Sequence, residues 1–478
     1  MSIATQHSVV RSRSKRQLSV DQVDRDASSY VDPHGFVFHW SGNIYRCIHE
    51  EHAPFYRSLI DQGLFQHWQN NFHLVSTGIA DLELIEHPGA LVLSHERVSP
   101  LTYCVEWCPS MLRKAGLATL NLANDLVGRG LMLQDAYPWN VLFRGTEAVF
   151  VDVTSIAPAD ERVIWPAHEQ FESFFYRPLV LAVRGMGQVA RSLLYDNISG
   201  VGMERFYGLL SSGYRLRHPG LAFTHWLHRR LSTSRKLKAK VRSLAAKAAP
   251  RIDNRVRKRF LQRLTRRLEN LRVVTSKDPW ENYYAEISAH VDKQAKLKQV
   301  GQFLDQLQPA TVLDLGCNTG VFSIEAARRG ATVVSVDSSE TCIETLFHAA
   351  EGEHLRITPV VSGVCCPTGS FGFMGTQYGC IWDRAQSDIV LCLGLMHHLH
   401  LTGRQSFERI AKLMSAVTRK TLIFEFVARD DENIELLPER RTVDYDLESV
   451  TDALRVHFPN IKVHDSDRPT RRLLLCTK

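Results

Sequence analysis

The sequence lacks the long apolar runs that would cross a membrane. Its 478 residues contain no stretch of about 18 consecutive apolar residues, so we expect no membrane-spanning helix. Residues 1–30 are rich in serine and carry four basic residues between positions 11 and 16, but they contain no apolar core. We therefore expect a disordered basic tail there rather than a secretory signal.

The ten cysteines lack the paired spacing that metal ligands require. Cys104 and Cys108, like the adjacent Cys365 and Cys366, have no second pair at a zinc-like distance along the chain. The sequence therefore predicts no metal site, and it predicts free thiols in a reducing, cytoplasmic setting.

Acidic residues are nearly absent between residues 229 and 272, where 17 lysines and arginines are accompanied only by Asp253 and Glu269. Apolar residues recur there at helical spacing, so residues 225–276 are predicted to form a basic amphipathic helical linker. Such a surface could bind nucleic acid or an anionic membrane. We favour a solvated linker that packs against an acidic neighbour.

The most informative segment is residues 314–320, D-L-G-C-N-T-G. An apolar run precedes it and a helix-like pattern follows it, so the segment is predicted to join a strand to a helix. Gly316 and Gly320 provide a backbone without side chains, and the helix start offers unpaired N–H groups to a nucleoside. Asp337 ends the next strand-like run, 23 residues beyond Asp314. A carboxylate at that position can accept hydrogen bonds from ribose hydroxyls.

The glycine spacing separates this turn from dinucleotide-binding turns. G-x-G-x-x-G would need glycine where Asn318 and Val321 stand. The observed D-x-G-x-x-x-G resembles motif I of the class I S-adenosylmethionine (SAM) methyltransferases. The resemblance implies an α/β, Rossmann-like methyltransferase domain over residues 277–478 with SAM as its cofactor. It assigns cofactor binding to Asp314, Gly316, Cys317, Asn318, Gly320 and Asp337.

Three residues near later strand ends are candidates for the catalytic base. His397 and His398 follow the apolar run 388–393, and Glu425 lies near the end of the run 421–426. Ligands of open α/β sheets bind at the carboxyl ends of the strands, and an imidazole can accept a proton near neutral pH. The alternative is that the histidines cap the next helix or pack under the cofactor.

One feature of the methyltransferase pattern is missing. Many relatives carry an aspartate after the third strand that contacts the adenine end of SAM. Here residues 360–367 read V-V-S-G-V-C-C-P and contain no acid. The adenine is therefore expected to be bound weakly or by backbone groups.

Residues 133–152 combine a polar loop with an apolar strand. Asp135 and Asn140 are five positions apart, and Asp152 directly follows an apolar run. The pattern resembles the catalytic loop of protein-kinase-like and aminoglycoside-phosphotransferase-like enzymes. That resemblance implies a proton-accepting Asp135, with Asn140 and Asp152 holding Mg²⁺.

The N-terminal region also departs from the kinase pattern. Gln134 stands before the aspartate, Val153 and Thr154 replace the usual Phe-Gly, and no glycine-rich phosphate loop or clear strand lysine is visible. We therefore predict that residues 31–224 form an α+β kinase-like accessory domain that is degenerate as a phosphotransferase. Within it, alternating apolar runs predict two hairpins, over residues 35–48 and 82–93.

The order of these features along residues 30–478 resembles a bacterial two-domain methyltransferase family that includes the rhizobial host-specificity nodulation protein NoeA. The resemblance implies a SAM-dependent methyltransferase acting on a small-molecule or saccharide- or lipid-linked acceptor, in nodulation signalling and host specificity. Two alternatives stay open. One is a non-catalytic signalling or binding protein with two degenerate enzyme folds, and the other is a nucleic-acid methyltransferase that uses the basic linker.

Overall fold

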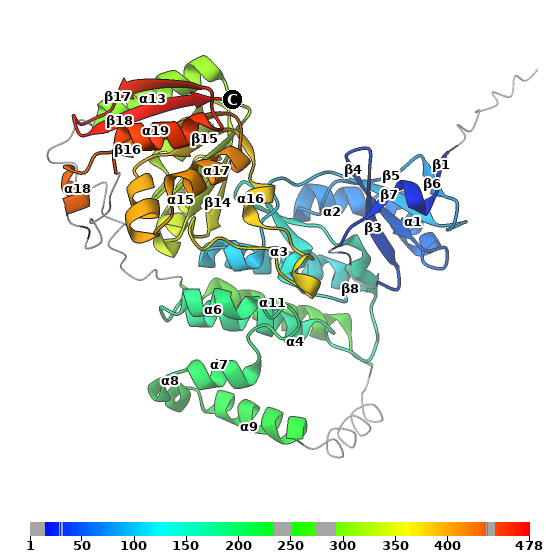
Figure 1. The fold of residues 1–478 in the computed structure, drawn as a ribbon. Helices are drawn as coiled ribbons and strands as arrows, with labels where there is room; N and C mark the ends of the chain where they lie inside the picture. Colours follow the sequence, from blue (N-terminus) through cyan, green and yellow to red (C-terminus); the bar gives the residue numbers. More distant parts are fainter. Residues whose placement is uncertain are drawn as a thin grey trace, which may run out of the picture. The chain divides into compact units, whose positions relative to one another are not determined.

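The computed structural model describes residues 15–27, 29, 32–233, 251–272, 293–435, 437 and 445–478 (Figure 1). The chain divides into two compact units, Met1–Arg97 and Val98–Lys478. Within the described residues, no helix combines the length and the apolar character needed to cross a bilayer. The predicted basic linker falls partly on residues 234–250 and 273–276, which lie outside the described residues.

The first unit is built on a five-stranded sheet with the order β2-β3-β4-β7-β5. Its strands are β2 (Asp24–Arg25), β3 (Gly35–Trp40), β4 (Asn43–Ile48), β5 (Thr77–Ile79) and β7 (Leu91–His95). Helices α1 (Ala53–Asp61) and α2 (Leu64–Phe72) connect β4 to β5. Antiparallel pairing of β3 with β4, from Gly35 opposite Ile48 to Trp40 opposite Asn43, confirms the first predicted hairpin.

The second predicted hairpin, over residues 82–93, is wrong. Strand β6 (Leu82–Leu84) pairs in parallel with β1 (Arg16–Leu18), whereas β7 pairs with β4 and β5. Contacts beyond the strands hold β6 to the earlier segment, because the Glu86 carboxylate accepts hydrogen bonds from Ser19 Oγ (2.6 Å) and Val20 N (2.9 Å).

Strand β1 also corrects the extent of the predicted tail. Residues 1–30 were expected to be disordered, yet Arg16–Leu18 forms a strand and Asp24–Arg25 pairs with β3. The cause is burial, since Leu18 packs into the hydrophobic cluster that contains Phe36 and Phe38. A basic, serine-rich composition did not reveal that one leucine of this segment belongs to a core.

The first long helix of the second unit is α3 (Pro109–Gly128). Two short antiparallel pairs follow, β8 (Leu131–Leu133) with β11 (Ile156–Pro158) and β9 (Val141–Arg144) with β10 (Glu147–Phe150). The helical segments after them are α4 (His168–Phe171), a π-helical turn (Glu172–Tyr176), α5 (Arg177–Ala182), α6 (Gly187–Leu194), α7 (Met203–Leu209), α8 (Ser212–Arg217) and α9 (Pro219–Thr233).

The described part of the basic segment includes helix α11 (Asn254–Glu269), which packs on α3. Its buried stripe consists of Leu261, Leu264 and Leu268. Arg113 of α3 donates hydrogen bonds to the carbonyl oxygens of Leu268 (3.2 Å) and Glu269 (2.9 Å) at the end of α11. The apolar stripe predicted from the sequence therefore serves packing between helices at these positions.

A seven-stranded sheet forms the rest of the second unit, with the order β14-β13-β12-β15-β16-β18-β17. The strands are β12 (Thr311–Leu315), β13 (Thr332–Asp337), β14 (Ile357–Val361), β15 (Ser387–Cys392), β16 (Thr418–Val427), β17 (Asn460–Asp465) and β18 (Arg471–Thr477). Strands β12 to β16 are parallel, and β18 runs antiparallel to both of its neighbours. The predicted Rossmann-like α/β class is confirmed.

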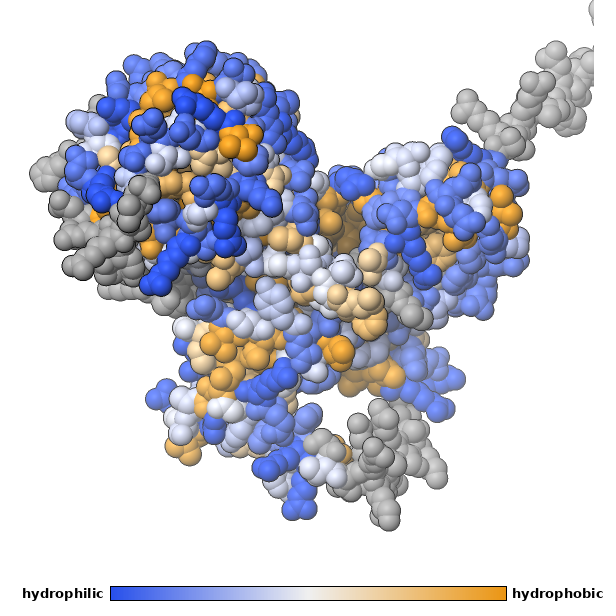
Figure 2. Space-filling model, viewed as in Figure 1, coloured by the Kyte–Doolittle hydropathy of each residue, from blue (hydrophilic) through white to orange (hydrophobic). Residues whose placement is uncertain are grey.

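Helices cover this sheet (Figure 1). They are α13 (Lys293–Leu307), α14 (Val321–Arg328), α15 (Glu340–Gly352), α16 (Ile381–Arg384), α17 (Phe407–Val417), α18 (Glu432–Glu435) and α19 (Leu447–Arg455). Apolar residues of α16, α17 and α19 join those of the central strands in one buried cluster. The face of this domain seen in Figure 2 is mainly hydrophilic, with small scattered hydrophobic areas over that core.

The strand order reverses between β12 and β15, because the chain continues from β12 to β13 and β14 on one side and to β15 and β16 on the other. In open α/β sheets this switch point leaves a crevice outside the carboxyl ends of the strands. The fold therefore brings the carboxyl ends of β12, β13, β15 and β16 to one edge of the sheet, on the two sides of the switch point.

Candidate functional site

The turn between β12 and α14 has the backbone that its glycines permit. Gly316 and Gly320 have φ angles of 68° and 82°, and Asn318 also has a positive φ of 52°. A Cβ on Gly320 would lie 2.3 Å from the Leu346 side chain, so the position excludes larger residues. The N–H groups of Gly316 and Cys317 both donate to Val336 O, which ties the turn to β13.

Cys317 is buried within this turn. Its thiol contacts Asn318 O at 3.5 Å, and burial holds its pKa well above the usual value. The side chain therefore packs the turn, and what the residue offers to a ligand is its backbone. Asn318 likewise uses its side chain locally, accepting a hydrogen bond from Thr319 N at 2.6 Å.

Asp314 lies under the turn with only 2% of its surface exposed. Its Oδ2 accepts a hydrogen bond of 2.6 Å from Ser323 Oγ, which in turn accepts one of 2.8 Å from Ser335 Oγ. Burial raises the pKa of this carboxyl to about 6, against the lowering effect of the Ser323 hydrogen bond, with Asp337 raising it further and Lys296 lowering it. The site thus contains a buried carboxylate that a cation would stabilise.

Asp337 ends β13 beside the same turn. Its Oδ2 accepts from Asn318 N and its Oδ1 accepts from Ser339 N, both at 2.8 Å. These two hydrogen bonds fix the position of the carboxylate at the end of β13. The structure therefore brings the predicted pair Asp314 and Asp337 to one end of two adjacent strands.

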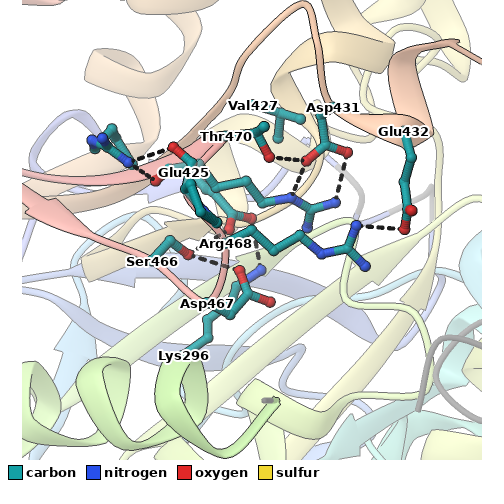
Figure 3. Close-up of polar contacts among 12 residues, drawn as sticks. Lys296, Glu425, Val427, Asp431, Glu432, Ser466, Asp467, Arg468 and Thr470 are labelled. Atoms are coloured by element: carbon teal, nitrogen blue, oxygen red, sulfur yellow. Dashed lines mark hydrogen bonds and ion pairs between the residues drawn. The ribbon is translucent and has the colours of Figure 1, made fainter. Parts of the chain in front are cut away.

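A lysine missed by the sequence reasoning completes this end of the sheet. Lys296 of α13 is buried, and its Nζ donates to Glu425 Oε2 at 2.6 Å (Figure 3). Ser466 Oγ lies 2.9 Å from Glu425 Oε1, so both oxygens of the buried Glu425 carboxylate have partners. A signal did exist, because Lys296 falls on the buried stripe of α13 with Val300 and Phe303, where a cation requires an anionic partner.

His397 and His398 follow β15 at the same edge, with ring centroids 4.2 Å apart. His397 is 2% exposed, and its Nδ1 has no hydrogen-bond partner among the described residues. Burial, reinforced by His398, lowers the pKa of His397 to about 3. His398 is only partly buried, and burial lowers its pKa as well.

The segment after β14 shows what occupies the place of the missing acid. Ser362 follows the strand, its N–H donates to Asp337 O at 2.8 Å, and its Oγ accepts from Thr368 N at 3.0 Å. Side-chain and backbone hydrogen bonds therefore fix this turn without a carboxylate. The polar groups there are hydroxyls and peptide groups.

The three residues of the kinase-like pattern also come together. Asp135 and Asn140 lie on the loop between β8 and β9, and Asp152 lies just beyond β10. Asn140 O accepts from Val151 N (2.8 Å), and Asp135 N donates to Ser155 Oγ (3.1 Å), which ties the loop to the segment around Asp152. Among the described residues, no group of three or more His, Cys, Asp or Glu side chains is arranged to hold a metal ion.

The carboxylates of this loop are engaged by neighbours. Gln170 Nε2 donates to Asp135 Oδ1 at 3.0 Å, and Thr154 Oγ1 donates to Asp152 Oδ1 at 2.8 Å. In the first unit, Arg46 is buried and forms an ion pair with Asp32 at 3.5 Å. These contacts give each charged group a local structural partner.

Sequence comparisons also identify methyltransferases among the proteins that this chain resembles. A family model described as a methyltransferase domain matches residues 282–446. The chain is 29% identical over 459 residues to the nodulation protein NoeA of Rhizobium meliloti (strain 1021), covering 92% of this chain and 93% of that protein. It is 27% identical over 133 residues to the O-antigen chain terminator bifunctional methyltransferase/kinase WbdD of Escherichia coli, covering 26% of this chain and 16% of that protein.

Comparisons with solved structures give partial matches. The crystal structure of monomeric WbdD aligns with a TM-score of 0.29 at 21% identity, over 39% of this chain and 42% of that chain. Magnesium protoporphyrin IX methyltransferase (ChlM) from Synechocystis PCC 6803 with bound SAH aligns with a TM-score of 0.29 at 19% identity, over 39% and 83%. The methyltransferase fold is therefore assigned from the strand order of the sheet and from the sequence matches, and not from these structural alignments.

Proposed function

We propose that this chain, which is a SAM-dependent methyltransferase similar to NoeA over nearly its whole length, methylates a hydroxyl group of a small-molecule, saccharide or lipid-linked acceptor. We also propose a role in nodulation signalling and host specificity, which the similarity to a protein named for nodulation supports. The observation that carries the proposal is the glycine turn of β12 with Asp314 and Asp337 at the switch point of the sheet.

The residues present fit SAM as a ligand. Asp337 is held at the end of β13 by hydrogen bonds from Asn318 N and Ser339 N, at the strand end where this fold receives ribose hydroxyls, and the glycine turn between β12 and α14 lies beside it. Asp314 is a buried carboxylate without a full counter-charge, which suits the ammonium group of the methionine end. The adenine end would lie against the peptide and hydroxyl groups around Ser362.

When bound, SAM would provide a sulfonium-activated methyl group, which would pass to the acceptor oxygen and leave SAH. The acceptor must also lose its proton. We assign the role of accepting this proton to His398, which follows β15 at the carboxyl edge of the sheet and is less buried than His397. His397, with a pKa of about 3, is a weaker base, and both Glu425 oxygens already have hydrogen-bond partners.

The kinase-like region is proposed to be a degenerate accessory domain. Asp135 and Asp152 accept hydrogen bonds from Gln170 and Thr154, which supports a structural use of these carboxylates. On this proposal, ATP with Mg²⁺ does not bind there.

Calorimetry with SAM tests the main proposal. We expect binding by the full chain that is lost or weakened at least about tenfold in Asp314→Ala and Asp337→Ala, since each removes a charged partner of the ligand. Asp388→Asn is the matched control, because Asp388 lies at the opposite, amino-terminal end of β15 and pairs with the exposed Lys420. Absence of binding, or equal binding by all variants, would refute the proposal.

The acceptor and the base need separate measurements. Metabolites of cells with and without the gene should differ by the mass of one methyl group on a hydroxylated compound. With that acceptor, His398→Gln should lower kcat by roughly 10²- to 10⁴-fold while the Kd for SAM is unchanged. An unchanged kcat would exclude His398 as the base.

A further inference from the structure

Two segments meet beside the Lys296–Glu425 pair, and neither takes part in the cofactor site. One joins β17 to β18, residues 466–470, and the other follows β16, residues 428–432. Ser466 connects the first to the Glu425 carboxylate at 2.9 Å. Figure 3 shows Arg468 between the Lys296–Glu425 pair and Glu432.

A buried ion pair fixes the frame of this region. Arg471 Nε donates to Asp431 Oδ2 at 2.8 Å, and its NH2 group donates to Asp431 Oδ1 at 3.1 Å. Thr470 Oγ1 also donates to Asp431 Oδ2, at 2.7 Å. The two residues are almost fully buried, and a bidentate pair of this kind sets a precise geometry. The backbone on both sides of Arg468 is therefore held in place.

Arg468 is a mostly buried cation whose ion-pair partner, Glu432, is exposed to solvent. Its side chain is 13% exposed, whereas that of Glu432, 2.5 Å away, is 67% exposed. Arg468 Nε is buried and has no hydrogen-bond partner among the described residues. A buried donor without a partner carries a free-energy cost that a ligand oxygen would remove. Glu432 reaches Arg468 from the solvent side, so replacing its carboxylate by a ligand oxyanion exchanges one charged partner for another at small cost.

His397 provides a second buried polar atom without a partner in the same neighbourhood. Its Nδ1 has no hydrogen-bond partner in the described part of the chain, and its surroundings include the charges of Arg471, Asp431 and Lys296. Geometry links the two places, because Gly394 follows β15 and a Cβ on it would lie 3.7 Å from Oε2 of Glu425, the residue that also accepts from Ser466. The Arg468 region therefore adjoins the residues that follow β15, where the proposed methyl transfer takes place.

We propose that Arg468 binds an oxyanion of the methyl acceptor, a carboxylate or a phosphate, which displaces Glu432 from the guanidinium. Glu432 then acts as a stand-in that neutralises Arg468 while the acceptor is absent. The inference rests on the proposed function, and it adds that the hydroxylated acceptor is anionic. A planar guanidinium matches either oxyanion with two parallel hydrogen bonds.

The test uses the full chain saturated with SAH and follows the binding of inorganic phosphate and of acetate by calorimetry, at constant ionic strength set with chloride. Phosphate and acetate distinguish the two sources of the oxyanion. Arg468→Gln is expected to weaken binding of the preferred anion at least about tenfold, because it removes a charge-assisted bond. Glu432→Gln is expected to tighten it roughly two- to fivefold, because it removes the competing carboxylate.

Asp430→Asn is the matched control, since it removes the same charge from an exposed neighbour of Glu432. The inference predicts a smaller effect for this variant than for Glu432→Gln. It is overturned if Glu432→Gln fails to exceed Asp430→Asn, if Arg468→Gln keeps wild-type affinity, or if neither anion binds. Failure of SAH to bind would instead refute the proposed function, so the two failures are distinguishable. Retained SAH binding by Arg468→Gln shows that this variant is folded.

Discussion

Replacing Asp314 with asparagine should stabilise the protein at neutral and alkaline pH while weakening its hold on SAM. The carboxyl group is buried, and its pKa rises from 3.8 to about 6 on folding. Each unit of pKa corresponds to about 1.36 kcal/mol, so the ionised group costs the folded state about 3 kcal/mol above pH 6. That figure already includes the hydrogen bond from Ser323, which favours the ionised form, so asparagine removes the whole net cost, and its Oδ1 can still accept from Ser323.

The pH dependence gives the sign of the effect. Because the folded pKa of Asp314 lies above the unfolded one, its contribution to stability is fully present below about pH 3.8 and is lost as the pH rises to about 6. Asp314→Asn should therefore exceed the wild type by roughly 3 kcal/mol at pH 8, and the gain should disappear at pH 4. Denaturant unfolding without cofactor at a series of pH values measures the difference.

Cofactor binding should change in the opposite sense. If the ionised Asp314 meets the ammonium of SAM, wild-type affinity falls as the pH drops below about 6, by up to tenfold per unit. Asp314→Asn should bind SAM more weakly, and its affinity should be independent of pH in this window. A variant no more stable than the wild type at pH 8, or a wild-type affinity that is flat between pH 5 and 7, would refute the reasoning.

Three further predictions concern other parts of the chain. Lys296→Met should destabilise the fold by about 3–5 kcal/mol in denaturant unfolding, because it leaves the buried Glu425 carboxylate unpaired, and adding Glu425→Gln should recover most of that loss. Gly320→Ala should abolish measurable SAM binding in calorimetry, because its Cβ would collide with Leu346 at a positive φ. ATP with Mg²⁺ should leave the melting temperature unchanged in both the wild type and Asp152→Ala, and a rise that this substitution abolishes would show an active kinase-like site.

The cofactor end of the site could be predicted from the sequence because its determinants are local. The spacing from Asp314 to Gly320 specifies one strand, one turn and one helix, and Asp337 ends the very next strand. Parallel strands then bring both carboxylates to one edge of the sheet without further information. The residues that locate the cofactor site therefore lie within one short stretch of the chain.

Long-range contacts explain what could not be predicted. Lys296 and Glu425 are 129 positions apart, and nothing along the chain pairs them except the charge on an apolar helix face. The β6 strand was assigned to the wrong partner because its true neighbour, β1, lies some 66 residues earlier, as the Val20–Glu86 bond shows. Pairing between residues so far apart depends on the packing of the whole core. A local apolar pattern does not contain that information.

The position of β18 constrains when this domain can fold during synthesis. Residues 471–477 are made after all other strands of the sheet, yet they lie between β16 and β17 and bond to both. Until they emerge from the ribosome, two strands have exposed hydrogen-bonding edges that are prone to aberrant pairing. A message truncated just before this segment would yield a polypeptide with the whole cofactor motif but an incomplete sheet, a natural substrate for chaperones and proteases.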